Sequence, residues 1–158
     1  MMLGKKRKIG RKIDEISPGE KLTLTEKIED KELLLYLGLS GDANPLYIQH
    51  DYASLTSYKK PVVPSLMLNG IVTAAIAKYL PGPGSYIKSM QFDYPQPVYH
   101  YETIQFLFEV DQVDQTAAEV IINIQGMNEE GKCVLDGRVA VKPPETIINT
   151  DGSALDNF

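Results

Sequence analysis

The sequence predicts a single α+β domain in which an antiparallel sheet curls around one long buried helix. A length of 158 residues suits one domain with its own core. The segment 64–80 is apolar on almost every side, as in a helix buried all round. Everything beyond it is a series of alternating segments separated by turns. A hydrophobic content of 43% with 23% charged residues excludes a disordered or collagen-like chain.

The first half of the chain predicts one strand and two short helices. Residues 21–28 alternate polar and apolar, as a half-buried strand does. Asp30 can cap the helix that follows, and the glycines in 38–41 end it. The Gly-Asp-Ala-Asn-Pro stretch at 41–45 consists of residues that favour turns, and a short amphipathic helix starts at Asp51.

The second half predicts the long helix and a meander of strands. Pro81-Gly82-Pro83-Gly84 ends the helix and lacks the strand–loop–helix context of a phosphate site. Apolar residues then alternate with polar ones, which predicts four antiparallel strands at 85–94, 102–110, 118–125 and 133–141. A helix and a sheet of this size bury each other best when the sheet curls around the helix. Because small sheets commonly hide their edges against a second copy, we expect a homodimer or higher homo-oligomer.

Charge divides the chain into a basic tail and an acidic body. Six of the sixteen basic residues lie in the first twelve positions, although the net charge is −5. We expect a basic flexible tail at 1–10, the domain at 11–142 and a disordered tail at 143–158. Nothing downstream supplies a basic or aromatic nucleic-acid surface, so we predict a solvated tail and no nucleic-acid partner.

Several other functional classes are excluded by composition. Cys133 is the one cysteine and there are two histidines, so the chain lacks the constellations that bind zinc, and we expect no metal and no cofactor. No apolar stretch follows the basic run as in a secretory signal, and polar residues interrupt the segment 66–80. We therefore expect a cytoplasmic protein without membrane insertion.

The turn at 41–45 lies inside a longer motif. Residues 40–47 are Ser-Gly-Asp-Ala-Asn-Pro-Leu-Tyr, and this stretch resembles the S-G-D-x-N-P-L-H motif of the MaoC-like family of (R)-specific enoyl-CoA hydratases without a gap. The resemblance runs from about Arg11 to Val141. It implies the hotdog fold and the hydration of a trans-2-enoyl thioester, or the reverse dehydration of the 3-hydroxy form.

The resemblance also implies roles for individual residues. Asp42 takes the place of the acid that activates water, and Asn44 shapes the loop that presents it. The catalytic histidine of the family falls on Tyr47, and its histidine-glycine pair before the central helix falls on Pro64-Ser65. The backbone N–H of Ser65 still offers a donor to the thioester oxygen. The alternative to a catalytic role for Asp42 is a structural one, in which the carboxylate only accepts a hydrogen bond from the backbone N–H two residues further along the chain.

The replacement of the histidine changes the available chemistry. A tyrosine is neutral at pH 7 and is not a ready base. His50 follows three residues later and is a possible substitute base, with a solvated helix start as the alternative. His100 lies in a turn without a motif, and we expect it to be exposed.

Three functions therefore stay open. The first is a hydratase or dehydratase that uses Asp42 with Tyr47 or His50, on coenzyme A or acyl carrier protein thioesters. The second is a silent protein that binds acyl thioesters, alone or as the partner of a complete hydratase subunit. The third is a thioesterase, against which the dehydratase-type loop argues.

Overall fold

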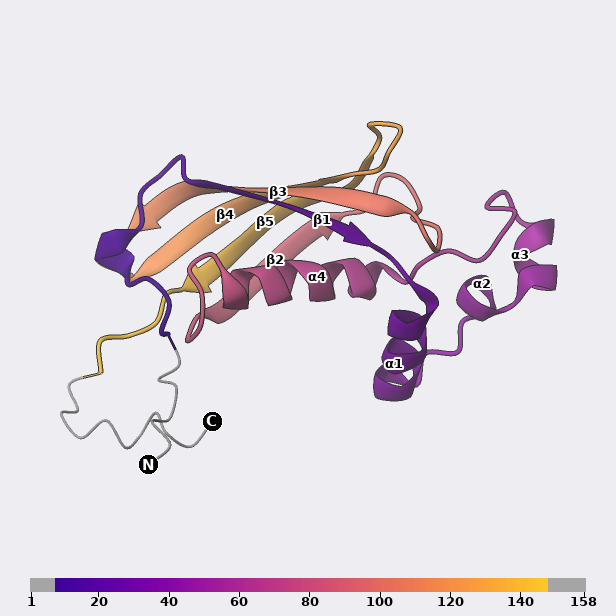
Figure 1. The fold of residues 1–158 in the computed structure, drawn as a ribbon, viewed down its shortest axis with the longest axis horizontal. Helices are drawn as coiled ribbons and strands as arrows, with labels where there is room; N and C mark the ends of the chain where they lie inside the picture. Colours follow the sequence, from indigo (N-terminus) through magenta and orange to yellow (C-terminus); the bar gives the residue numbers. More distant parts are fainter. Residues whose placement is uncertain (1–7, 148–158) are drawn as a thin grey trace, which may run out of the picture.

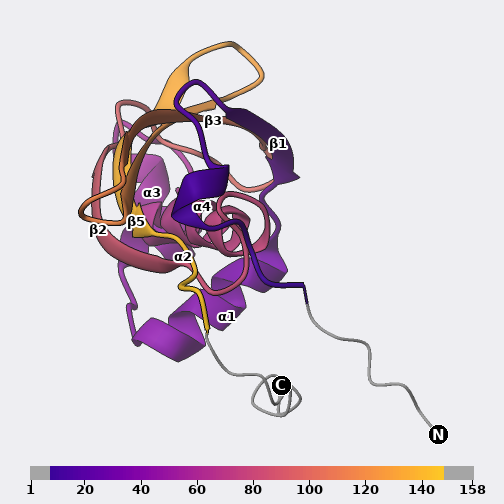
Figure 2. The same ribbon diagram turned by 90° about the vertical axis from the view of Figure 1, so that its left-hand side faces the viewer.

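A five-stranded antiparallel sheet curls around one helix in the computed structural model, which describes residues 8–147 (Figures 1 and 2). The spatial order of the strands is β1-β3-β4-β5-β2, and every neighbouring pair is antiparallel. The strands are β1 (Lys21–Lys27), β2 (Tyr86–Asp93), β3 (Thr103–Asp114), β4 (Glu119–Met127) and β5 (Cys133–Lys142), and the helix inside the curl is α4 (Ser65–Lys78). The predicted α+β hotdog fold is confirmed.

The core forms between the inner face of the sheet and α4. Alternate residues of β3, β4 and β5 are buried, as the period of two along a strand requires. Phe106 and Phe108 are fully buried and face Leu24 and Leu22 of β1 across the sheet. They pack in one cluster with the inward-facing residues of α4, which are Leu68, Val72, Ala75 and Ile76.

The prediction that this helix is buried all round is wrong. Leu66 at its start and Tyr79 just after it are each about 60% exposed, and Ala74 and Ala77 are exposed between them. The sheet covers one side of α4 only, so an apolar stripe of the helix has no partner among the described residues. The edge of β2 that faces away from β5 is likewise unpaired there.

Three short helices form a layer at one end of the sheet (Figure 1). They are α1 (Asp30–Ser40), α2 (Pro45–Ile48) and α3 (His50–Leu55). Gly41 ends α1 in the left-handed conformation, with a φ of 69°, which glycine adopts without steric cost. The turn chemistry at 41–45 does not predict α2, a single turn with Pro45 at its start.

Contacts at both predicted domain limits extend beyond residues 11 and 142. The N–H of Gly10 donates to the carbonyl of Pro83, and Pro143 and Pro144 are buried. Pro144 packs against Gly84, at the end of the sheet that also carries the short 3-10 helix Ile13–Glu15. The remainder of the two predicted tails, residues 1–7 and 148–158, lies outside the described residues.

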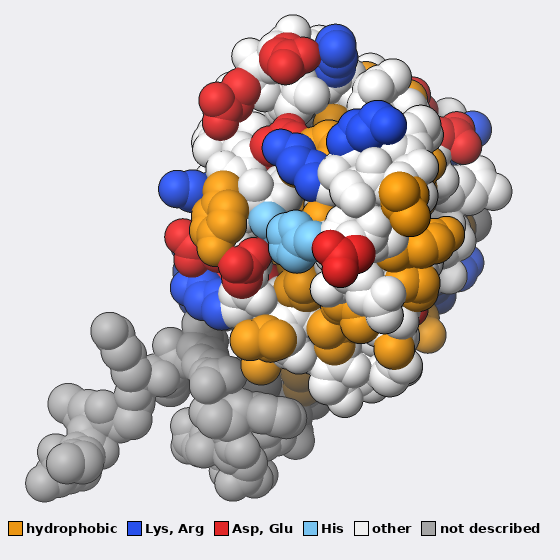
Figure 3. Space-filling model, turned by 90° about the vertical axis from the view of Figure 1, so that its right-hand side faces the viewer, with side chains coloured by type: hydrophobic (Ala, Val, Ile, Leu, Met, Phe, Trp, Pro, Cys, Tyr) orange, Lys and Arg blue, Asp and Glu red, His pale blue; other side chains and the backbone are white. Residues whose placement is uncertain are grey.

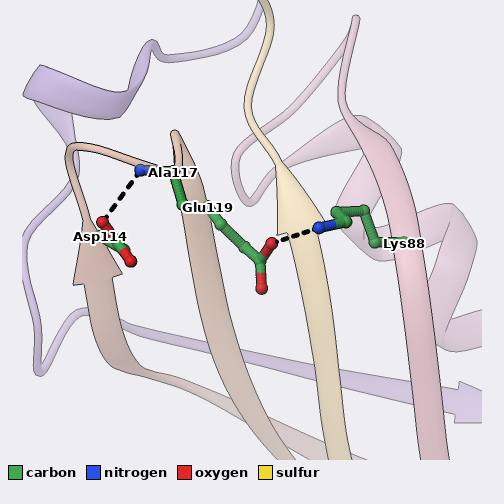
Figure 4. A network of polar contacts seen from close by, with 4 residues as sticks. All are labelled: Lys88, Asp114, Ala117 and Glu119. Carbon is green, nitrogen blue, oxygen red and sulfur yellow. Dashed lines mark hydrogen bonds and ion pairs between the residues drawn. The ribbon is translucent and has the colours of Figure 1, made fainter.

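Polar contacts tie the strands together at the end of the sheet opposite α1–α3 (Figure 4). Lys88 of β2 reaches over β5 to Glu119 of β4, with 2.8 Å between Nζ and Oε2. In the β3–β4 turn, the N–H of Ala117 donates to Asp114 Oδ1 at 3.0 Å. None of these residues belongs to the predicted site, which lies at the other end. Across residues 8–147, no helix combines the length and apolarity needed to span a membrane.

Candidate active site

The loop between α1 and α2 holds the carboxylate of Asp42 in a fixed position. Its Oδ2 accepts a hydrogen bond from the Tyr36 hydroxyl at 3.0 Å, and its Oδ1 accepts one from the Asn44 N–H at 3.2 Å. The Asp42 N–H donates to Ser40 Oγ at 3.1 Å, and the Ser40 hydroxyl donates to the Tyr36 carbonyl at 2.7 Å. The bond from Asp42 to the backbone two residues on is therefore present, but the second oxygen has a side-chain partner as well.

Tyr36 is a site residue that the sequence did not indicate, because it lies among the apolar residues of a predicted amphipathic helix. Its pKa is raised, first by burial and then by the hydrogen bond to Asp42. The nearby Tyr47 hydroxyl raises it further. Tyr36 therefore stays protonated and donates to Asp42 across the physiological pH range.

Asn44 and Tyr47 are held by the single turn of α2. The Asn44 side chain accepts a hydrogen bond from the Leu46 N–H at 3.0 Å, and its carbonyl accepts one from the Tyr47 N–H at 2.9 Å. Asn44 is therefore the N-cap of α2, which agrees with its expected role of shaping the loop. Tyr47 is half-buried, and it lines a cavity beneath α1.

This cavity has a volume of about 600 Å³ and lies at the end of the molecule shown in Figure 3, where histidine side chains border hydrophobic and acidic ones. Its apolar wall comes mostly from α1 and α2. Its polar wall contains Tyr47, His50 and His100. The apolar residues are Leu33, Leu34, Leu37, Ile48 and Pro61.

The two histidines differ in their surroundings. His50 is exposed at the first position of α3. The expectation that His100 is exposed is wrong, because its side chain is only 13% exposed. The turn before β3 presses the His100 ring against Asp30, the first residue of α1, with 3.4 Å between Nδ1 and Oδ1. Burial lowers the pKa of His100, the Asp30 carboxylate opposes that change, and His50 adds to it.

Of the predicted site residues, only Tyr47 and His50 line the cavity, whereas Asp42, Asn44 and Ser65 do not. Ser65 is the first residue of α4, follows the buried Pro64 and is half-exposed. Among residues 8–147, the N–H groups of Ser65 and Leu66 find no acceptor, so they are free to bind an anionic or carbonyl oxygen. The strand-like segment before α4 is tied to the site loop, because the Val62 N–H donates to the Leu46 carbonyl at 3.1 Å.

Two other prominent hollows, both formed within residues 8–147, contain none of the predicted site residues. A groove of about 330 Å³ runs between β1, the start of α1 and α4, and a wider polar depression of about 920 Å³ lies on the outer face of the sheet. Within residues 8–147, no three metal-ligating side chains converge. Cys133 is half-buried, and burial raises the pKa of its thiol, so the thiolate that a metal requires is disfavoured.

Known proteins are similar to this chain. Residues 9–130 match the MaoC-like domain family. The (R)-specific enoyl-CoA hydratase of Rhodospirillum rubrum is 26% identical over 131 residues, which cover 83% of this chain and 90% of that protein. The 3-hydroxybutyryl-CoA dehydratase of Methylorubrum extorquens is 23% identical over 134 residues, covering 84% of this chain and 83% of that protein.

A solved structure of an R-hydratase is also similar to this chain. The unliganded R-hydratase PhaJ1 from Pseudomonas aeruginosa aligns with a TM-score of 0.79 and 28% identity, covering 87% of this chain and 88% of that one. The family match spans well over half of the chain. This chain is a member of the MaoC-like domain family.

Proposed function

We propose that this protein is a hydratase, or in the reverse direction a dehydratase, that adds water to a trans-2-enoyl thioester. The observation that carries the proposal is the Asp42 carboxylate, held between Tyr36 and the Asn44 N–H on a loop inside the range that matches the family. Relatives that share the fold are named for hydration and dehydration of coenzyme A thioesters. Coenzyme A and acyl carrier protein are both carriers that this chemistry accepts.

We assign different roles in the reaction to Asp42, to the start of α4 and to Tyr47. Asp42 keeps lone pairs free to accept a hydrogen bond from the attacking water, because its two protein partners leave part of each oxygen open. We assign the polarisation of the thioester oxygen, which takes up negative charge as water attacks C3, to the free N–H groups at the start of α4. Tyr47 donates or accepts a hydrogen bond but does not replace the base.

The assembly that we propose is a homodimer. The edge of β2 that faces away from β5 is unpaired within residues 8–147, the exposed stripe of α4 is apolar, and a second copy related by a two-fold axis would cover such surfaces. The helical layer also carries exposed leucines, with Leu39 and Leu55 each more than 85% exposed. A separate hydratase subunit on the same surface is the competing partner.

The test is hydration of crotonyl-coenzyme A by the purified protein, followed as loss of the enoyl absorbance. We expect turnover in the wild type and a loss of at least about a hundredfold in Asp42→Ala. Asn123→Ala on the outer face of the sheet is the matched control, because it leaves the loop unchanged. Release of free thiol in place of hydration would instead identify a thioesterase.

A second variant separates an active enzyme from a silent binding protein. If the wild type is inactive but Tyr47→His gains turnover, the site is intact and lacks only its base, and the natural protein is a thioester-binding subunit. If neither the wild type nor Tyr47→His turns over crotonyl thioesters, and these thioesters do not raise the melting temperature of either protein, the proposed substrate class is refuted.

A further inference from the structure

A groove along α4 takes no part in the site described above. It has a volume of about 330 Å³ and lies between β1, the start of α1 and α4. It follows α4 from Met67 to Lys78, which is about 16 Å of helix at about 1.5 Å of rise per residue. Its volume corresponds to roughly ten water-sized groups at about 30 Å³ each. The groove therefore suits a long, narrow ligand of about that size.

The lining of this groove is mostly apolar. Its buried and half-buried apolar residues are Leu24, Ile28, Met67, Ile71 and Ala75. Of the four charged side chains that line it, Glu26, Lys27 and Lys78 are exposed, and only Glu32 is half-buried. An uncharged alkyl chain gains most from such a surface, because each methylene group removed from water strengthens binding about fourfold.

One end of the groove lies beside both elements that carry the candidate site. The start of α4 and the helix α1 are at the same end of the sheet (Figure 1). Met67 lines the groove and directly follows the two residues of α4 whose N–H groups are free. Glu32 also lines it, one helical turn before Tyr36, whose hydroxyl donates to Asp42 at 3.0 Å. Asp42 itself does not line the groove, so a ligand in it continues past the reacting carbons.

The groove is on the opposite side of α4 from the strand edge that we assign to a second copy. β1 and β2 form the two edges of the sheet, and they flank α4 on opposite sides (Figure 2). The groove is formed with β1, whereas the proposed dimer uses the edge of β2. A dimer through that edge leaves the groove available to a small molecule.

On the basis of the proposed function, we propose that this groove binds the alkyl tail of a medium-chain trans-2-enoyl thioester. The thioester and the C2=C3 bond stay outside, at the start of α4, and the carbons beyond C3 run along the helix toward Lys78. The seven carbons beyond C3 of a decenoyl group fit the volume of about 330 Å³. Crotonyl, with one carbon beyond C3, leaves the groove empty.

Gly70 is the specificity-determining position of this groove. It lies in the middle of α4, where glycine disfavours the helix relative to alanine, and it lines the groove. A Cβ added to Gly70 would have no atom within 4 Å, so the missing side chain leaves open space. A larger side chain at this position fills the groove without displacing the rest of the protein.

The test compares kcat/KM for crotonyl-coenzyme A and trans-2-decenoyl-coenzyme A in the wild type, Gly70→Leu and Gly38→Leu. We expect the wild type to favour the decenoyl substrate by at least about tenfold, mainly through KM, because the tail is bound equally in the ground and transition states. Gly70→Leu should remove this preference and keep kcat/KM for crotonyl-coenzyme A within about twofold. Gly38→Leu is the matched control, because Gly38 lies in α1, has no atom within 4 Å of an added Cβ and does not line the groove.

The outcomes separate this inference from the proposed function. A wild type that turns over crotonyl-coenzyme A at least as efficiently as the decenoyl substrate overturns the role of the groove and leaves the hydratase standing. The same holds if Gly70→Leu keeps the preference for the longer chain. If Gly70→Leu changes only the sedimentation from dimer to monomer, a second copy fills the groove and the inference is overturned.

A wild type without turnover on either thioester refutes the hydratase, and binding then tests the groove alone. Decanoyl-coenzyme A should raise the melting temperature of the wild type more than coenzyme A does, and Gly70→Leu should lose that difference. Equal melting temperatures with the two ligands would overturn the groove as well.

Discussion

Replacing Gly137 with alanine should force β2 away from β5. Gly137 of β5 faces Phe92 of β2 and Ile124 of β4, so strands flank it on both sides. An added Cβ would lie 1.9 Å from the Gln91 carbonyl oxygen and 2.6 Å from Phe92 Cδ1, where real Cβ contacts essentially never fall below 3.0 Å. The carbonyl belongs to the backbone and has no rotamer to escape into. β2 must therefore shift by about 1 Å, at a cost of about 3 kcal/mol, the upper end for overpacking.

The measurement is the free energy of unfolding from urea titrations of wild type and Gly137→Ala. Gly38→Ala is the matched control, because Gly38 lies within α1 and has no atom within 4 Å of the added Cβ. We expect the control to gain about 0.5–1 kcal/mol from the higher helix propensity of alanine. An unfolding free energy of Gly137→Ala equal to that of the wild type would refute the packing of β2 on β5.

Three further predictions concern the site and the apolar surface. Tyr36→Phe removes the donor to Asp42 and should lower crotonyl-coenzyme A turnover about tenfold, the rate equivalent of one lost hydrogen bond to a charged group; an unchanged rate would mean that Tyr36 plays no part. Burial lowers the pKa of His100, so below the ordinary value of 6.5 the unfolded chain binds a proton more readily, and stability should decline there as pH falls. Urea midpoints between pH 5 and 7.5 should show this decline in the wild type and a smaller one in His100→Gln. Leu66→Lys on the exposed stripe of α4 should shift sedimentation from dimer to monomer, and an unchanged mass would place the interface elsewhere.

The strands and the central helix could be predicted because their patterns are local and strong. The alternation in β3 and β4 matches the buried residues directly, since Phe106, Phe108 and Ile122 lie on one face at a spacing of two. The end of α1 at Gly41 was equally predictable from turn chemistry. The one-turn helix α2 was not, because proline and asparagine in 41–45 favour a turn and a helix N-terminus alike.

The exposure of α4 could not be derived from its composition. An apolar residue count does not distinguish a helix surrounded by its own chain from one that shares its surface with a second copy. Leu66 and Ala74 are as apolar as Leu68 and Ala75, yet the first two are exposed and the second two are buried. An apolar face that its own fold leaves open is the usual mark of an interface.

The loop motif identifies Asp42 but not the residues that act with it. Tyr36 contacts Asp42 because α1 ends at a glycine in the left-handed conformation, which turns the chain back toward the helix. The spacing of residues in the sequence does not predict that contact. The contact between His100 and Asp30 is another that the sequence does not indicate, because 70 positions separate the two residues and the pairing of the turn before β3 with Ile28 joins them. A substitution at one motif position therefore does not decide whether a site has lost its chemistry. Residues that only the fold brings to the loop also decide what the site can do, as Tyr36 does when its hydroxyl donates to Asp42.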